Sequence, residues 1–272
     1  MWNNVSCRKL KKISSWRSIS LAAWDTPRDP SVYGSMEVDL SKALRHLETL
    51  NAKSSVKVTV THLVIRAVAL TLSRYPELNV LIRHRNIYLR DHVDIFVQVF
   101  LEEGGKADLS GAKIKDADKK SLTEIAQELS KKAGWIRASD DKSLGKSKGF
   151  LRHISPLLLT PLIRFLAYLA YDWNINGKWL GVDRDPFGGV MITSVGMFGL
   201  RAGFAPIVPF SRTPLLFTVG MVEKRPIAID DKVEIRPMLS MTATADHRII
   251  DGYLGSLAAK SIREFLENPE KL

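Results

Sequence analysis

The chain has 272 residues, of which 45% are hydrophobic and 25% charged, which is close to the globular average and excludes a disordered or collagen-like chain. Its single cysteine, Cys7, excludes an intrachain disulfide framework and a thiolate zinc cage, and it favours a reducing, cytoplasmic location. The formal net charge of +11 suits anionic partners such as nucleic acid, anionic lipid or coenzyme phosphates, without choosing among them.

The N-terminal segment, residues 1–15, is basic, with four Lys and Arg residues between positions 8 and 12. No apolar run with a small-residue cleavage site follows it, so we expect no secretory signal peptide. The most apolar stretch, residues 154–171, contains two prolines and Arg164. A membrane-spanning helix needs about 20 mostly apolar residues, so this stretch is interpreted as a buried or interfacial segment.

The first half of the chain alternates helix and strand signals. Its helices begin or end at recognisable residues: a cap, a proline, or a capping box of Ser121 with Glu124. Its strands show apolar and polar residues in partial alternation. The predicted elements are a helix at residues 39–50 capped by Asp39 or Ser41, a helix at 60–75 ended by Pro76, strands at 86–89 and 94–100, and a helix from Ser121 to about residue 132.

The second half begins with residues 134–187, in which a basic loop precedes the apolar segment and a loop containing Trp and Gly follows it. We interpret this stretch as an insertion into one domain that spans residues 16–272. The chain then becomes rich in strand patterns, including a hairpin around Asp230-Asp231. The predicted elements are strands at 189–195, 215–222, 227–229, 233–235 and 238–245, and a terminal helix at 252–266 that Asn268 and Pro269 end. This order predicts a mixed α/β (α+β) fold around one large sheet.

The most informative motif is Asp246-His247-Arg248-Ile249-Ile250-Asp251-Gly252, between the last strand and the last helix. A histidine on such a turn can act as a general base near neutral pH. Asp251 can stabilise the helix start through its charge, and Gly252 is predicted to provide backbone freedom. The alternative is a hydrogen-bonded loop histidine with a capping aspartate and no catalytic role.

This motif resembles the C-terminal motif of the dihydrolipoyl acyltransferases of 2-oxoacid dehydrogenase complexes, and its HxxxDG core resembles that of the chloramphenicol acetyltransferases. Further blocks resemble the acyltransferase family in the same order, and the resemblance covers roughly residues 16–133 and 187–272. Those blocks are residues 38–79, residues 113–126, Gly189-Val-Met-Ile-Thr-Ser-Val-Gly196, Phe204-Ala-Pro-Ile-Val208 and the terminal Glu267-Asn-Pro-Glu-Lys-Leu272. The resemblance implies the two-layer, chloramphenicol acetyltransferase-like fold and a homotrimer or larger homo-oligomer.

The same resemblance implies an enzyme that moves an acyl group between two thiols, those of coenzyme A and dihydrolipoamide. His247 would remove the proton of the attacking thiol, because the thiolate is the nucleophile. Thr193, with Ser194 beside it, matches the family's hydroxyl that stabilises the oxyanion. The resemblance places the histidine and the hydroxyl on neighbouring subunits. Ordinary strand polarity is the alternative for Thr193 and Ser194.

The remaining site residues are expected to support the turn. Asp251 would fix the histidine turn by pairing with an arginine near the N-terminus, for which Arg17 is the best match by position. Asp246, Arg248 and Gly252 are interpreted as structural supports of the site.

Coenzyme A is expected as the cosubstrate acyl-CoA, and no metal is expected. No covalent lipoyl group is expected on this chain, because Asp118-Lys119, which superficially resembles the lipoyl-lysine dipeptide, lies in a block that matches the catalytic domain. The chain begins almost at that domain, without a lipoyl or a peripheral-subunit-binding domain. The acceptor is therefore expected to be a lipoyl group on another protein in trans, or a different thiol, amine or hydroxyl.

Two questions have more than one answer at this point. Residues 134–187 could supply extra core or subunit contact, a wall or lid for a long acyl chain, or contact with a membrane surface. The chain could also be a non-catalytic trimeric scaffold related to the acyltransferase core, although a scaffold does not need His247, Asp251 and a hydroxyl at position 193 together. A nucleic-acid partner rests on charge alone, since no recognised motif is present, and none is expected.

Overall fold

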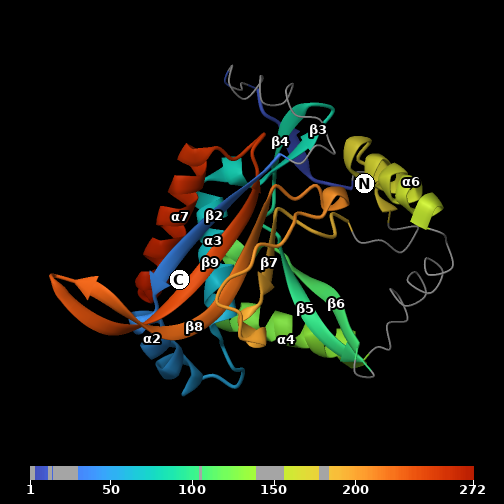
Figure 1. Cartoon of the computed structure of the whole chain (residues 1–272). Coiled ribbons are helices and arrows are strands. Elements are labelled where there is room, and N and C mark those ends of the chain that lie inside the picture. Colours follow the sequence, from blue (N-terminus) through green and yellow to red (C-terminus); the bar gives the residue numbers. More distant parts are fainter. Residues whose placement is uncertain (1–3, 12–13, 15–29, 104–105, 139–155, 178–183) are drawn as a thin grey trace.

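The computed structural model describes residues 4–11, 14, 30–103, 106–138, 156–177 and 184–272. Six strands form the main sheet in the order β2-β9-β8-β7-β5-β6 (Figure 1). β5, β7 and β8 run parallel, and the other neighbours pair antiparallel. A smaller sheet has the order β1-β4-β3. The strands are β1 (Cys7–Lys9), β2 (Ser31–Asp39), β3 (Val80–Arg83), β4 (Asn86–Arg90), β5 (Ile95–Glu103), β6 (Lys106–Ile114), β7 (Val190–Ser194), β8 (Leu215–Ile229) and β9 (Lys232–Asp246).

Among the described residues, helices cover one face of the main sheet and give the fold its two layers (Figure 1). The core lies between the layers, and Leu63, Ile192, Met241 and Ile262 are each at most 1% exposed there. Burial of an aliphatic side chain of this size contributes about 1.5–3 kcal/mol. The covering helices are α2 (Ser41–Asn51), α3 (Val60–Arg74), α4 (Leu122–Ala138) and α7 (Gly252–Glu267). The short helices are η1 (Pro76–Leu78), η2 (Ala117–Lys119), η5 (Gly196–Phe198), η6 (Pro209–Ser211) and η7 (Pro269–Lys271).

The helix starts follow the capping chemistry of the sequence. Ser121 Oγ accepts a hydrogen bond from the Glu124 N–H at 3.3 Å, and the Ser121 N–H donates to Glu124 Oε2 at 2.8 Å. This confirms the predicted capping box, but α4 continues to Ala138, so residues 134–138 are helical instead of loop. At the start of α2, Asp39 Oδ1 accepts a hydrogen bond from the Ser41 N–H at 2.8 Å. The residue directly before the helix is Leu40, whose apolar side chain cannot accept this bond, so Asp39 does so in its place.

The strand pattern around Asp230 and Asp231 differs from the prediction in its extent. β8 and β9 are each continuous over 15 residues, whereas the sequence suggested four shorter strands. The turn itself is confirmed, because Asp230 and Asp231 have φ angles of 46° and 63°, as a two-residue hairpin turn requires. The outer halves of both strands form a ribbon that projects beyond the sheet (Figure 1), and a strand exposed on both faces has no need of apolar alternation.

Four of the described strands were not predicted from the sequence: β1, β2, β3 and β6. β2 pairs with β9 over all nine of its residues and forms one edge of the main sheet. β6 pairs with β5 along its whole length at the other edge. Edge strands carry polar residues and glycine more readily than central strands. These residues interrupt the alternation of apolar and polar side chains from which a strand is predicted.

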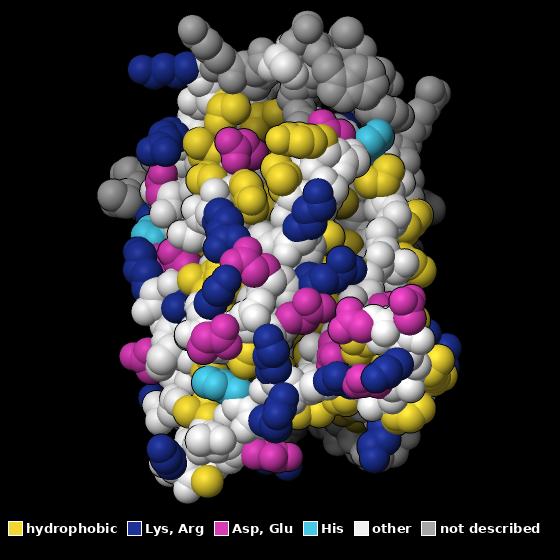
Figure 2. Space-filling model, turned by 90° about the vertical axis from the view of Figure 1, so that its left-hand side faces the viewer, with side chains coloured by type: hydrophobic (Ala, Val, Ile, Leu, Met, Phe, Trp, Pro, Cys, Tyr) yellow, Lys and Arg dark blue, Asp and Glu magenta, His cyan; other side chains and the backbone are white. Residues whose placement is uncertain are grey.

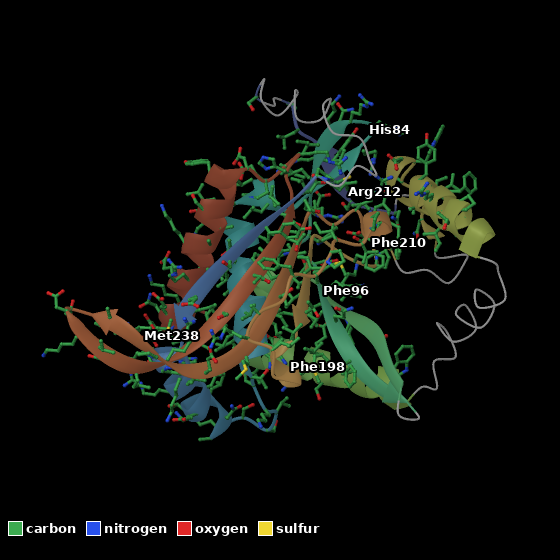
Figure 3. All side chains as sticks on the ribbon, in the orientation of Figure 1. His84, Phe96, Phe198, Phe210, Arg212 and Met238 are labelled. Atoms are coloured by element: carbon green, nitrogen blue, oxygen red, sulfur yellow. The ribbon has the colours of Figure 1, made fainter. Side chains whose placement is uncertain are left out.

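Within the stretch that we interpreted as an insertion, the described residues include α6 (Pro156–Ala167) and the π-helical turn η3 (Tyr168–Asp172). α6 lies against η6, and Phe210 and Arg212 are beside it in Figure 3. Arg212 Nη2 forms an ion pair with Asp172 Oδ2 at 2.8 Å. Burial raises the pKa of the Tyr171 phenol, which is 3% exposed and packs with Val5 and Leu81.

Several large apolar side chains of this stretch are nevertheless exposed in the single chain. They are Leu162, Phe165, Leu166, Tyr168 and Trp173, between 36% and 63% exposed. None of the described helices is long and apolar enough to cross a membrane.

Candidate active site

His247 lies in the turn directly after β9, which ends at Asp246. The turn is held by backbone hydrogen bonds to two neighbouring segments: the His247 N–H donates to the Pro30 carbonyl at 2.9 Å, and the Asp246 N–H donates to the Pro214 carbonyl at 2.8 Å. His247 Nδ1 lies 3.0 Å from the carbonyl oxygen of Ile250. Because a carbonyl only accepts, Nδ1 must carry the hydrogen, and the lone pair of the neutral ring lies on Nε2. This is the tautomer that a proton acceptor needs.

Asp251 is the N-cap residue of α7, with an extended backbone. Its Oδ1 accepts from the Leu254 N–H at 2.9 Å, which satisfies one of the unpaired donors at the helix start. The short segment between His247 and α7 is therefore closed at both ends by hydrogen bonds. Arg17, the predicted partner of Asp251, lies outside the described residues.

Gly252 does not have the role that the sequence suggested. Among the described glycines, only Gly188 and Gly199 have positive φ, so Gly252 adopts a backbone conformation open to any residue. It is the first residue of α7, and a Cβ built there would meet no atom within 4 Å. What the glycine provides is open space beside His247.

Asp246 and Arg248 form an ion pair across the histidine. Arg248 Nη2 lies 2.6 Å from Asp246 Oδ2, and both side chains are about one-seventh exposed, at 14% and 13%. Asp246 Oδ1 also accepts from the Arg248 N–H at 3.0 Å. A two-pronged contact of this kind fixes geometry as well as adding energy, so it limits the conformations open to the turn.

Thr193 and Ser194 are the last two residues of β7. Successive residues of a strand point to opposite faces, so their hydroxyls do not share a face. Ser194 follows Ile192 onto the helix-covered face. Thr193 aligns across the sheet with Thr218 of β8, which aligns with Thr242 of β9, and Thr242 Oγ1 bonds to the carbonyl of Gly203 on the face away from the helices.

Thr193 and His247 are not brought together within one chain. Their registers place Thr193 level with Thr242, which is two strands away and five residues before His247. With about 3.4 Å per residue along a strand and about 4.8 Å between strands, the two residues lie roughly 15–20 Å apart. A base and an oxyanion donor must both reach one carbonyl group, so these two residues of the same chain cannot serve one substrate.

A pocket of about 440 Å³ opens beside His247. It lies between β2 and β9 of the sheet and the first half of α7, with Asp251 and Gly252 at the same end as His247. The remaining wall is mostly apolar and includes Met36, Leu78, Leu215, Phe217, Met241 and Ile250. Sequence reasoning missed the β2 wall because it missed β2. The apolar residues Val32, Met36 and Val38, spaced by even numbers, were the available signal.

The surface on the α7 side of the molecule carries charges of both signs. Figure 2 shows Lys and Arg interspersed with Asp and Glu over most of the surface, with hydrophobic side chains gathered at one end. The formal charge of +11 therefore does not form one continuous basic patch on this face. Over the part of the chain that the structure describes, no three His, Cys, Asp or Glu side chains lie close enough to hold a metal ion.

Comparison with known proteins identifies the family to which this chain belongs. Residues 22–143 and 187–272 match the family model for the 2-oxoacid dehydrogenases acyltransferase (catalytic domain). The chain belongs to this family. The dihydrolipoyllysine-residue acetyltransferase component of the pyruvate dehydrogenase complex of Rickettsia prowazekii is 28% identical over 88% of the chain and 49% of its own length. The dihydrolipoyllysine-residue succinyltransferase component of the 2-oxoglutarate dehydrogenase complex of Staphylococcus saprophyticus is 31% identical over 76% of the chain and 38% of its own length. The chain thus spans about half or less of the length of these curated relatives.

Solved structures confirm the fold class. The cubic core of the pyruvate dehydrogenase multienzyme complex superimposes with a TM-score of 0.67 at 19% identity, over 97% of this acyltransferase-family chain and 93% of the other. Chloramphenicol acetyltransferase superimposes with a TM-score of 0.55 at 14% identity, over 96% and 100% of the two chains. The predicted chloramphenicol acetyltransferase-like fold is therefore correct.

Proposed function

We propose that this chain transfers an acyl group from acyl-CoA to a thiol acceptor, with His247 as the general base. The observation that carries the proposal is the His247 turn: Nδ1 is fixed by the Ile250 carbonyl at 3.0 Å, so Nε2 is the atom that accepts a proton. Membership of the acyltransferase family and the open pocket beside the ring support the same function. The curated relatives named above are acetyl- and succinyltransferases of lipoyllysine residues, so a lipoyl thiol is the first acceptor to test.

The reaction is balanced by one proton that the histidine holds temporarily. Nε2 takes the proton from the acceptor thiol, and the resulting thiolate attacks the thioester carbonyl carbon. A new carbon–sulfur bond forms, and the carbonyl oxygen carries the negative charge until the bond to the coenzyme A sulfur breaks. The departing thiolate takes the proton back from the imidazolium and leaves as free coenzyme A. A hydroxyl that donates to the transient oxyanion lowers the barrier, and Thr193 is proposed for this role.

The site is proposed to form between subunits of a homo-oligomer. The support for this is the separation of Thr193 from His247 by roughly 15–20 Å within one chain, so that the hydroxyl must come from a second copy. The structurally similar cubic core is an assembly by its own description. A closed homotrimer satisfies the requirement with three identical sites, since each subunit gives its histidine to one neighbour and its hydroxyl to another.

The chemistry is tested by measuring free coenzyme A thiol released from acetyl-CoA, with and without dihydrolipoamide. We expect acceptor-dependent release that His247→Ala abolishes. His46→Ala, a histidine substitution on α2, is the matched control and should leave the rate unchanged. Release that continues in His247→Ala would remove the histidine from the mechanism. No release from a folded oligomer with any donor would favour a non-catalytic scaffold.

The shared site is tested by mixing two inactive variants. His247→Ala and Thr193→Val each lack one partner, and random reassembly into trimers restores about one quarter of the sites, those with both groups intact. If both groups acted within one subunit, mixing would restore nothing. A Thr193→Val variant that remains fully active would show that another donor serves the oxyanion.

A further inference from the structure

The pocket beside His247 is larger and more apolar than an acetyl or succinyl group requires. Its 440 Å³ compares with the roughly 150 Å³ of an apolar cavity that holds benzene, a six-carbon ring, and it falls within the roughly 300–1,000 Å³ of small-molecule sites. An acetyl group presents only one methyl group beyond its carbonyl. Most of the pocket would therefore stay empty with an acetyl donor.

The charges of the wall also disfavour a carboxylate. Among the described residues of the wall, the ionisable side chains are those of Tyr33, His247 and Asp251, and none is a Lys or Arg. With its carbonyl carbon within reach of His247, a succinyl group would place its carboxylate among the apolar residues of the wall, where the charge would lose its hydration. An alkyl chain meets no such penalty, because the thioether and aromatic groups of Met36, Met241 and Phe217 provide apolar contact.

The position of the pocket connects it to the chemistry. His247, Asp251 and Gly252 lie at one end, and the pocket continues from there between β2 and α7. An acyl group whose carbonyl carbon is within reach of His247 can therefore extend its chain along this space. We propose that the pocket binds the acyl chain of the substrate and selects an uncharged acyl group of about six to eight carbons. The inference rests on the proposed acyl transfer and specifies its substrate class.

One glycine sets the depth of the pocket. Gly34 of β2 aligns with Ala243 of β9, and both residues line the pocket. Position 34 lies on the same face of the strand as the buried Val38, so a side chain added there points toward α7. A Cβ built at Gly34 meets no atom within 4 Å. The first atom of a side chain at position 34 would thus enter the pocket without a clash, a larger side chain would take up more of its space, and strand propensity favours the change.

The experiment compares initial rates with acetyl-, butyryl-, hexanoyl-, octanoyl- and succinyl-CoA for the whole protein. In the wild type, kcat/KM should rise by up to about fourfold for each methylene group that enters the pocket, and succinyl-CoA should be the poorest donor. Gly34→Leu should lower kcat/KM for hexanoyl-CoA by about tenfold or more and leave acetyl-CoA within about twofold. Gly34→Ala should fall between the two.

The matched control is Gly134→Leu on α4, the same substitution at an exposed position where a Cβ also meets no atom within 4 Å. It should reproduce the wild-type profile. Thermal unfolding of each variant checks the fold, and Gly34→Leu should unfold no earlier than the wild type. A wild type that prefers acetyl- or succinyl-CoA, or a hexanoyl rate that Gly34→Leu leaves unchanged, would overturn the assignment of the pocket while acyl transfer itself stands.

Octanoate binding, measured by calorimetry, tests the pocket without turnover. Binding to the wild type and to Gly134→Leu, with loss in Gly34→Leu, would support the apolar chain as ligand even if no donor were turned over, in which case the proposed function alone would fail. Absence of both binding and chain-length dependence would refute the pocket's role.

Discussion

Asp251 allows two contributions to the stability of the catalytic turn to be separated. Its Oδ1 accepts from the Leu254 N–H at 2.9 Å, and its charge lies at the start of α7. Loss of a capping acceptor costs about 1 kcal/mol, and loss of a negative charge at a helix start costs about 0.3–1 kcal/mol. Asp251→Ala should therefore lower the free energy of unfolding by about 1.3–2 kcal/mol, whereas Asp251→Asn keeps the acceptor and should lower it by about 0.3–1 kcal/mol.

Urea and thermal unfolding at one fixed protein concentration measure these differences, because subunit association makes apparent stability depend on concentration. The expected decrease in Tm for Asp251→Ala is about 3–8 °C. Ser121→Ala removes the uncharged cap of α4, whose Oγ accepts from the Glu124 N–H, and is the matched control at about 1 kcal/mol. If Asp251→Asn proved as damaging as Asp251→Ala, capping would not be the main contribution, and a charged partner would have to account for the loss.

The predicted partner, Arg17, can be tested although it lies outside the described residues. A double-mutant cycle of Arg17→Met with Asp251→Asn should give a coupling energy above about 0.5 kcal/mol if the two side chains interact. Effects that add within about 0.3–0.5 kcal/mol would contradict the pairing.

Two further predictions concern buried ionisable groups. Asp185→Ala should lower the free energy of unfolding by about 3–5 kcal/mol in a urea titration, because it leaves the buried Arg90 side chain, which is 2% exposed, without its ion-pair partner. The control is Glu264→Ala, which breaks the exposed ion pair with Arg74 and should cost under about 1 kcal/mol in the same titration. Burial lowers the pKa of His62 from 6.5 to about 4, so the unfolded chain takes up a proton that the native chain does not, and stability that is complete above about pH 6.5 is lost as the pH falls toward 4. His62→Gln should remove up to about 3 kcal/mol of that loss while keeping an acceptor for the Thr59 N–H, and an unchanged pH profile would show that His62 does not cause it.

The parts of the site that the sequence predicted are those in which neighbours in sequence are neighbours in space. The turn at His247, the cap at Asp251 and the capping box at Ser121 each span three or four residues, so spacing and side-chain chemistry define them. The backbone role given to Gly252 was wrong, because a motif does not report φ. The proposed roles of Thr193 and Ser194 remain predictions, since the structure shows their positions and not their chemistry.

What the sequence did not show depends on pairing between distant segments. β2 reads Ser-Val-Tyr-Gly-Ser-Met-Glu-Val-Asp, in which Gly34 and the polar residues hide the alternation of an edge strand. Its place beside β9, some 200 residues later in the chain, is set by the sheet order and by no local pattern. The pocket followed from this pairing, so neither its volume nor its apolar wall was accessible before the structure.

This difference in origin suggests that chemistry and selectivity can change independently in this fold. The His247 tautomer depends on the Ile250 carbonyl within the same short turn, and a side-chain substitution on another strand does not remove that carbonyl. The depth of the pocket depends on the absence of a side chain at Gly34, one strand away, where the added atoms meet nothing. A substitution there alters the space for the acyl chain without touching the proton acceptor. Position 34 is therefore where we expect acyl-chain selectivity to change while His247 stays the same.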